Sequence, residues 1–248
     1  MLKNKTIIAT IDIETYPAKV LMYGSTYEPI IVKILEFEKI LSMSYKIGYG
    51  KTKYIGLNTI PGYKPGDLND KKLMIEISKV LSNIDYVCGQ NSDQFDLKKI
   101  RERILCHQLP PIPDIPSLDT KKLFKQVSKL PNNKLDTLSQ FVGTGQKITH
   151  SGTSLFTACG EGDPKAWKLN EKYNNQDVEI THAALMKIMP YVKLPAGGIK
   201  PIGDTMKCTH PTCSGLMHKH DLRRVVAGFK QQWKCNTCGH YHTPNKLV

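Results

Sequence analysis

The 248-residue sequence lacks several features that would assign it to common classes of protein. No apolar run approaches the roughly 18 residues that a membrane-spanning helix needs. The first residues, MLKNKTIIATIDIET, contain neither the apolar segment nor the small-residue cleavage site of a signal peptide. A glycine-rich phosphate-binding loop and a Ser-His-Asp or Cys-His order are also missing, which argues against ATP dependence and triad chemistry. We therefore expect a cytoplasmic protein without a membrane segment.

Acidic residues are few compared with basic ones, at 22 Asp and Glu against 35 Lys and Arg, a net charge of +13. A chain this basic attracts polyanions, because each phosphate that it neutralises releases condensed counterions. A lysine-rich solvated surface would give the same total, so charge alone leaves both interpretations open. The positive charge is densest in residues 199–248, which hold eight basic and two acidic residues.

The order of the expected strands and helices predicts an α/β fold with a mixed sheet flanked by helices. Apolar, β-branched runs predict strands at residues 6–13, 19–23, 40–47, 53–57, 84–88 and 117–118. Apolar stripes, capping residues and stop signals predict helices at residues 70–81, 95–105, 119–129, 135–142 and 163–189.

The chain is long enough for one substantial core and a small additional domain. Residues 191–206 are rich in proline and glycine and predict a linker. We therefore expect a main domain at residues 1–190 and a small C-terminal domain at residues 207–248.

Asp12 and Glu14 lie two residues apart in a strand-like run, so their side chains project from one face of the strand. Two neighbouring carboxylates repel each other unless a cation lies between them, and Mg²⁺ and Mn²⁺ prefer oxygen ligands. An Asp-x-Glu pair also occurs by chance at strand ends, so the pair alone leaves both interpretations open.

A further carboxylate, Asp96, follows the strand expected at 84–88 and lies near the start of the next helix. Capping of the positive helix end is an alternative role for Asp96, although Asp93 competes for that position. Asn91 lies at the strand end, where ligand-facing loops occur in α/β folds, and is a candidate substrate contact.

Tyr173 and Asp177 are four residues apart in the last long helix, so they share one face of it. A tyrosine hydroxyl can hydrogen-bond a metal-bound water, and a carboxylate one turn away can complete the metal shell. The alternative is an amphipathic helix whose tyrosine belongs to the core.

In this order, the three signatures resemble the DEDD (DnaQ-like, RNase H-fold) superfamily of 3′–5′ exonucleases. Motif one matches Asp12-Ile13-Glu14, motif two the stretch from Asn91 to Asp96, and motif three, in its tyrosine form, Tyr173 to Asp177. Segments such as GQNSDQFDLKKI and GDPKAWKLNEKYNNQDVEIT are similar to stand-alone bacteriophage exonucleases described as subunits of DNA polymerases. The resemblance covers about residues 6–190 and is weak over residues 25–60.

The resemblance implies an RNase H-like fold and hydrolysis with two Mg²⁺ or Mn²⁺ ions. Asp12 would bridge the two ions, Glu14 and Asp177 would complete one site, and Asp96 would support the other. Tyr173 would orient the attacking water. Two further acids in segments similar to the family, Asp119 and Asp136, are better explained as helix caps.

Four of the seven cysteines are clustered near the C-terminus, and no secretion signal accompanies them. The pairs Cys208/Cys213 and Cys235/Cys238 have zinc-ribbon spacing, and four thiolates would fill the shell of one structural Zn²⁺. Disulfides or unrelated thiols are the alternatives. One cysteine could be replaced as a ligand by a nearby histidine: His210, His240 or His242. Of the isolated cysteines, Cys88 is expected in the core.

Between the cysteine pairs, basic and aromatic residues are mixed, as on surfaces that bind phosphates and stack bases. The candidate nucleic-acid contacts there are Arg223, Arg224, Lys230 and Trp233. Trp233 and Phe229 would equally suit the core of a small domain.

These features predict a metal-dependent 3′–5′ exonuclease that releases 5′-mononucleotides from single-stranded DNA or DNA 3′ ends. The resemblance implies replication proofreading or DNA degradation, a polymerase or replisome partner, and a bacterial host's cytoplasm if the chain is phage-encoded. An RNA exonuclease would share all the catalytic residues, because contacts with the 2′-hydroxyl cannot be read from one sequence. The other alternative is a non-catalytic nucleic-acid-binding accessory protein of replication.

Overall fold

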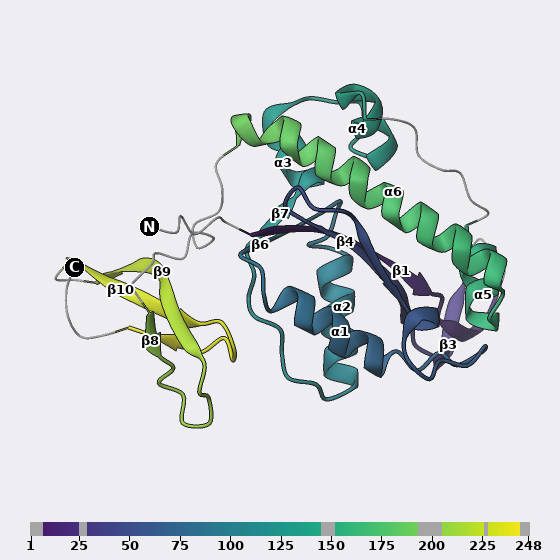
Figure 1. The fold of residues 1–248 in the computed structure, drawn as a ribbon, viewed down its shortest axis with the longest axis horizontal. Coiled ribbons are helices and arrows are strands. Elements are labelled where there is room, and N and C mark those ends of the chain that lie inside the picture. The colour runs from purple at the N-terminus through teal and green to yellow at the C-terminus, as the bar shows by residue number, and fades with distance from the viewer. Residues whose placement is uncertain (1–6, 25–28, 145–151, 193–204, 226–227, 244–248) are drawn as a thin grey trace.

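The computed structural model describes residues 7–24, 29–144, 152–192, 205–225 and 228–243. These residues form a five-stranded sheet, a four-stranded sheet and a two-stranded hairpin (Figure 1). The five-stranded sheet has the order β5-β4-β1-β6-β7. Its strands are β1 (Ile8–Tyr16), β4 (Lys39–Ile47), β5 (Lys53–Gly56), β6 (Tyr86–Gly89) and β7 (Ser117–Asp119).

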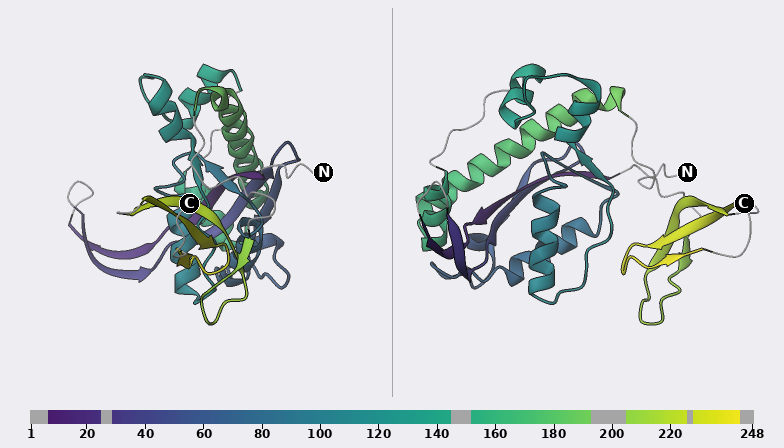
Figure 2. Two further views of the ribbon diagram at one scale, coloured as in Figure 1. Left: turned by 90° about the vertical axis from the view of Figure 1, so that its left-hand side faces the viewer. Right: turned by 180° about the vertical axis from the view of Figure 1, so that it is seen from behind.

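The central strand β1 pairs antiparallel with β4 and parallel with β6, so the sheet is mixed as predicted. Its alternating side chains separate the two faces. Ala9, Ile11 and Ile13 are buried in one hydrophobic core, together with residues of α1 (Lys71–Leu81) and α2 (Asp96–Cys106). The intervening positions Asp12 and Glu14 face the long helix α6 (Pro164–Ile188), which crosses the opposite face (Figure 2).

A second hydrophobic core lies beneath α6, where α3 (Thr120–Val127) and α4 (Leu135–Val142) pack beside it. The bounds of α4 and the start of α6 agree with the sequence prediction. Gly143 ends α4 in the left-handed region, at φ 68°, which glycine adopts without steric cost. Asp163 caps α6 by accepting the Lys165 N–H at 2.9 Å.

Among the strands and α-helices of residues 7–192, two were not predicted, the helix α5 (Thr153–Glu161) and the strand β3 (Ile30–Glu36). The strand predicted at Lys19–Tyr23 forms as β2, but it pairs with β3 in a separate hairpin that projects from the main sheet (Figure 2, left). Apolar side chains are exposed along the whole hairpin. Its residues do not contribute to the buried cores.

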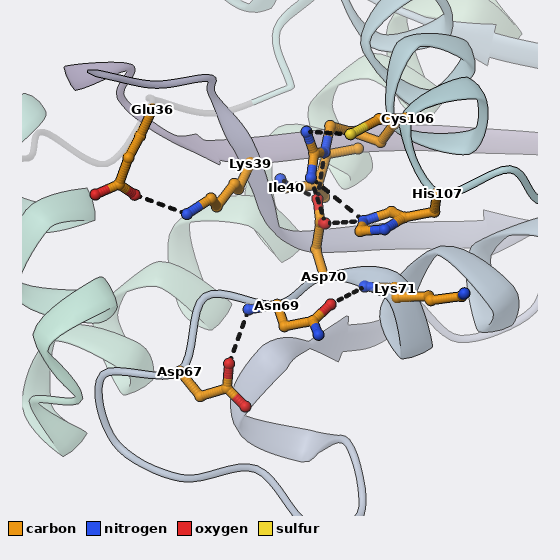
Figure 3. A network of polar contacts seen from close by, with 10 residues as sticks. Glu36, Lys39, Ile40, Asp67, Asn69, Asp70, Lys71, Cys106 and His107 are labelled. Carbon is orange, nitrogen blue, oxygen red and sulfur yellow. Dashed lines mark hydrogen bonds and ion pairs between the residues drawn. The ribbon is translucent and has the colours of Figure 1, made fainter. Parts of the chain in front are cut away.

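A buried ion-pair network ties the start of α1 to the end of α2 and to β4 (Figure 3). The carboxylate of Asp70 is fully buried and accepts from Arg103 Nε and Nη2, each at 2.8 Å. It also accepts the Ile40 N–H at 3.0 Å and lies 2.5 Å from His107 Nε2. Burial would raise the pKa of Asp70, but the hydrogen bonds from Arg103, His107 and Ile40 outweigh it and hold this pKa below its usual value.

Replacing Asp70 with asparagine should lower the free energy of unfolding by about 3–5 kcal/mol, because Arg103 is left buried without its counter-charge. Urea unfolding measures the loss. The control is Glu76→Gln, which breaks the exposed pair with Lys79 and should cost about 0–1 kcal/mol.

The network should also make the stability of the wild-type protein depend on pH in the acid range. A carboxyl whose pKa is lower in the folded state contributes stability above its unfolded pKa of about 3.9. That contribution is lost as the pH falls below this value, so Asp70→Asn should flatten the acid limb of the stability curve. An unchanged acid limb would show that Asp70 does not contribute.

The four-stranded sheet near the C-terminus has the order β11-β10-β9-β8 (Figure 1). Its strands are β8 (Thr205–Lys207), β9 (Leu216–Val225), β10 (Gly228–Cys235) and β11 (Tyr241–His242). Lys234 of β10 forms an ion pair with Asp114, in the proline-rich segment before β7. Two short 3₁₀ helices, Leu57–Thr59 and Met189–Tyr191, complete the described elements. Within the described residues, no helix has the length and apolarity needed to span a membrane.

Candidate active site and metal centre

The parallel strands β1, β6 and β7 bring acidic residues to one edge of the main sheet. Asp12 and Glu14 lie in the second half of β1, Asp96 follows β6, and Asp119 ends β7. The register between β1 and β4 shifts between Glu14 and Thr15, so β1 is irregular beside these acids. Such bulges re-aim side chains and are common next to active sites.

Asn174, on the inner face of α6, holds Asp12 in place. Its Nδ2 donates to Asp12 Oδ2 at 2.6 Å and to the Asp12 carbonyl oxygen at 3.1 Å. Its Oδ1 accepts from Ser42 Oγ on β4 at 3.3 Å. Asn174 is fully buried, so these hydrogen bonds satisfy an amide that would otherwise be costly to bury.

Asp96 is buried at the first position of α2, with 3% of its surface exposed. Its Oδ1 accepts the backbone N–H of Ile13 at 3.1 Å. Ile13 lies between Asp12 and Glu14 in β1, so this hydrogen bond fixes the Asp96 carboxylate beside that strand. Burial raises the pKa of Asp96 to about 7, against the lowering effect of the Ile13 and Asp96 N–H groups, and the charge of Asp119 adds to the rise. A nearby cation would restore the ionised form.

The hydroxyl of Tyr173 lies among carboxylates. Burial raises the pKa of Tyr173, and the charges of Asp177, Glu14 and Asp12 raise it further, as does a hydrogen bond with Asp177. Tyr173 and Asp177 are 6% and 3% exposed, so both side chains of the predicted third motif point into the protein. The hydroxyl therefore stays protonated at neutral pH and remains able to donate a hydrogen bond.

The acidic residues are spread more widely than the ligands of a single ion. Among the described residues, no three carboxylates of the set have oxygen atoms all within 4.8 Å of one another. Ligands of two ions about 3.5–4 Å apart need not meet such a limit. The donor set consists of oxygen atoms, two of its members are buried, and three of them, Asp12, Glu14 and Asp177, act on a neutral hydroxyl. This chemistry fits hard divalent cations.

The loop that contains Asn91 is organised by Asp119. The Asp119 carboxylate accepts the N–H groups of Asn91, Asp93 and Lys122 at 3.1–3.3 Å, so its predicted role as the cap of α3 is confirmed. Asn91 adopts the left-handed conformation, at φ 63°, and its Oδ1 accepts from Lys121 Nζ at 3.1 Å.

Two capping predictions were wrong. Asp93 does not cap α2, because its carboxylate pairs with Lys122 Nζ at 2.6 Å. Asp136 lies in the first turn of α4 and accepts from Gln140 Nε2 at 3.1 Å, while Lys134 occupies the cap position. In both cases a nearby side chain supplies a donor in place of the helix N-terminus.

The four clustered cysteines form a group that could hold a metal ion, and their sulfur atoms all lie within 4.8 Å of one another. The Sγ atoms of Cys208 and Cys238 are 3.6 Å apart, and those of Cys213 and Cys235 are 3.7 Å apart. A disulfide would need about 2.05 Å. Tetrahedral Zn²⁺ with Zn–S bonds of about 2.3 Å places sulfur atoms about 3.8 Å apart, so the spacing suits zinc.

Three of the four cysteine sulfur atoms accept a hydrogen bond from the backbone N–H group two residues further along the chain. His210 donates to Cys208 and Gly215 to Cys213, each at 3.4 Å, and Thr237 donates to Cys235 at 3.3 Å. Each of these tight turns places a thiol beside a backbone N–H group of its own loop. Gly215 is required there, because a Cβ atom would collide with the Thr237 side chain.

The histidine alternatives fall outside the group. Its members, among the described residues, are the four cysteines alone. His240 Nε2 instead lies 3.1 Å from Thr209 Oγ1, and the rings of His210 and His240 pack edge to face with their centroids 5.5 Å apart. Cys88 is fully buried in β6, which confirms its predicted place in the core.

The candidate nucleic-acid contacts lie on the β9–β10 hairpin. Lys230 is paired directly opposite Arg223, and Trp233 opposite Lys219, with a register shift between Gln232 and Trp233. Lys230 and Trp233 are three residues apart in β10, so the two pairs lie on opposite faces of the hairpin. Lys219 Nζ lies 5.9 Å from the centre of the Trp233 ring. Arg223 is exposed, while Lys230 and Trp233 are partly exposed. The side chain of Arg224 lies outside the described residues.

Comparison with known proteins gives matches among solved structures and none by sequence. No protein-family model and no curated protein matches the chain. Among solved structures, the chain is similar to the family B DNA polymerase from the hyperthermophilic archaeon Pyrobaculum calidifontis, with a TM-score of 0.56 and 14% identity. The match covers 75% of this chain and 25% of the polymerase chain. Similarity at this identity shows a shared fold.

Proposed function

We propose that residues 1–190 form an RNase H-like exonuclease domain of the tyrosine-type DEDD class, which removes 5′-mononucleotides from DNA 3′ ends. The observation that carries the proposal is the convergence of Asp12, Glu14 and Asp177 on the Tyr173 hydroxyl, with Asp96 tied to the same strand. The fold shared with a DNA polymerase and the net charge of +13 support a nucleic-acid substrate.

The oxygen ligands suit two Mg²⁺ or Mn²⁺ ions, held by Asp12, Glu14, Asp96 and Asp177. When bound, such ions supply a nucleophilic water at neutral pH and stabilise the leaving 3′ oxygen. We assign Asp12 to both ions, Glu14 and Asp177 to one, and Asp96 to the other.

The chain's own residues prepare this chemistry. Asn174 fixes the rotamer of Asp12 through the 2.6 Å hydrogen bond. The Ile13 N–H fixes Asp96, so the two carboxylates are positioned before substrate binds. The neutral Tyr173 hydroxyl orients the attacking water, because the surrounding charges keep its proton in place.

Replacing Tyr173 with phenylalanine should lower kcat by about a hundredfold with little change in KM, since the hydroxyl orients water and does not bind DNA. Steady-state release of labelled nucleotides measures the change. The matched control is Tyr63→Phe, which removes a hydroxyl that accepts from Trp167 Nε1 of the same helix at 3.3 Å. Equal kcat values for the two variants would remove Tyr173 from the mechanism.

We further propose that residues 191–206 link this domain to a zinc ribbon at residues 207–248. In the ribbon, Arg223 and Lys230 are like charges directly opposite each other, an arrangement that repels unless an anion lies between them. Arg223 and Lys230 offer phosphate pairing, and the Trp233 ring offers base stacking. Asn91 is assigned to the substrate at the catalytic end.

DNA is favoured over RNA by the similarity to a DNA polymerase fold, and a polymerase is the proposed partner. Matched single-stranded DNA and RNA substrates test this assignment. Faster hydrolysis of DNA is expected. Faster hydrolysis of RNA would assign the same site to an RNA exonuclease, and binding of both without hydrolysis would assign the chain to a non-catalytic accessory role.

A further inference from the structure

A groove of about 820 Å³ lies between the β4–β5 turn and the outer face of α6. Its size is within the usual range of small-molecule and cofactor sites. Its lining includes Lys46, Tyr49, Lys51, Lys172, Gln176 and Glu179. None of these residues belongs to the proposed catalytic set.

The groove carries positive charge that its own acid does not neutralise. Glu179 accepts from Lys46 Nζ at 2.6 Å and also from Thr52, so the Lys46–Glu179 pair has no net charge. Burial would raise the pKa of Glu179, but these two hydrogen bonds hold it below its usual value. Lys51 and Lys172 form no ion pair with any described carboxylate. They leave two positive charges facing the groove.

An aromatic ring is presented beside these lysines. Tyr49 is 79% exposed and packs edge to face on His182, with the ring centroids 6.1 Å apart. His182 is 6% exposed and contacts Thr10 Oγ1 through Nδ1 at 3.0 Å, while its buried Nε2 has no hydrogen-bond partner among the described residues. A largely exposed aromatic ring thus packs against a buried histidine.

The groove and the carboxylates lie on different flanks of α6. Glu179 follows Asp177 by two residues, which places it about 200° around the helix. The two sites are nevertheless close. Asn175, which also lines the groove, accepts from Ser44 Oγ at 2.8 Å, and Ser44 is paired with Asp12 in the sheet.

We propose that this groove binds a single-stranded segment of nucleic acid upstream of the 3′ nucleotide that is removed, an inference that rests on the proposed nucleic-acid substrate. Lys51 and Lys172 bind backbone phosphates, and a base stacks on Tyr49. A single strand is favoured over a duplex because stacking on Tyr49 requires an unpaired base. The groove thereby sets a preference for longer substrates.

Binding is tested in the Asp12→Asn background without added divalent ions, so that no hydrolysis is measured and failure of the exonuclease proposal can be distinguished. Fluorescence anisotropy compares labelled single strands of about 16 and about 4 nucleotides, the span of site sizes for single-strand binders. Lys51→Ala/Lys172→Ala should weaken binding of the longer strand about tenfold and reduce the salt slope by about 1.4. Binding of the short strand should be unchanged.

The control Lys71→Ala/Lys79→Ala removes the same charge from α1, on the other face of the sheet, and should leave binding of both strands unchanged. Tyr49→Ala should weaken binding of the longer strand about fivefold or more, and Tyr49→Phe should restore it, because the ring face is retained. The proposal is overturned if the Lys51/Lys172 variant matches the control, or if it loses affinity equally for both lengths.

Discussion

Asparagine in place of Asp12 is expected to lower kcat by about a thousandfold or more while leaving DNA binding intact. Asparagine has nearly the shape of aspartate and can keep the 2.6 Å hydrogen bond from Asn174 through its side-chain oxygen. It carries no charge, so it cannot hold the cations that Asp12 is proposed to share. The loss should therefore appear in kcat with the fold preserved.

The matched control is Asp163→Asn, an acid-to-amide change at the N-cap of α6, where asparagine caps about as well as aspartate. Its kcat should equal that of the wild type. Circular dichroism of both variants checks the fold. Wild-type kcat in Asp12→Asn would show that this carboxylate does not take part in hydrolysis.

Removal of zinc is expected to unfold the four-stranded sheet formed by β8 to β11. The cysteine cluster joins the Cys208–Cys213 segment to the Cys235–Cys238 segment. Among the described side chains of the ribbon, only two apolar residues are buried, Met217 and Cys235. A domain with so little core depends on its metal for folding. Cys235→Ser should have the same effect, because Cys235 is the buried member of the cluster.

Proteolysis and bound-zinc analysis measure this outcome. The wild type should contain one zinc per chain, and chelation should expose the β9–β10 hairpin to protease while the main sheet stays protected. Cys106→Ser, which replaces an exposed cysteine of α2, is the control and should retain its zinc. A protease-resistant hairpin in zinc-free protein would contradict a structural role for the metal.

Much of the main domain could be predicted because local signals agree with the tertiary structure. The apolar run at β1 is largely buried, and Asp163 and Pro164 provide the cap and the first turn of α6. The strand β3 and the helix α5 could not be predicted in the same way. The apolar residues of β3 are exposed in a hairpin, so no alternation between core and solvent marks the strand. The short α5 begins without a side-chain cap.

The candidate site could be predicted only in part. The spacing of Tyr173 and Asp177 indicated a shared helix face, but the function of Asn174 between them depends on strand β1, 162 residues away. In the sequence, the only local signal for this function is an asparagine three residues before Asp177. The burial of that asparagine is seen in the structure alone. Likewise, the roles of Asp93 and Asp136 depend on Lys122 and Gln140, because a side-chain donor competes with the helix end.

The central claim is that the carboxylates around Tyr173 hydrolyse nucleic acid from its 3′ end. The most direct measurement follows single-stranded DNA labelled at either end, with Mg²⁺ or Mn²⁺ and zinc-loaded protein. We predict that the wild type releases a 3′ label at once as a 5′-mononucleotide and shortens the 5′-labelled strand stepwise. The Asp12→Asn variant should leave both labelled strands intact. The claim is contradicted if the folded, metal-loaded wild type leaves both DNA and RNA intact, or if Asp12→Asn degrades them equally fast.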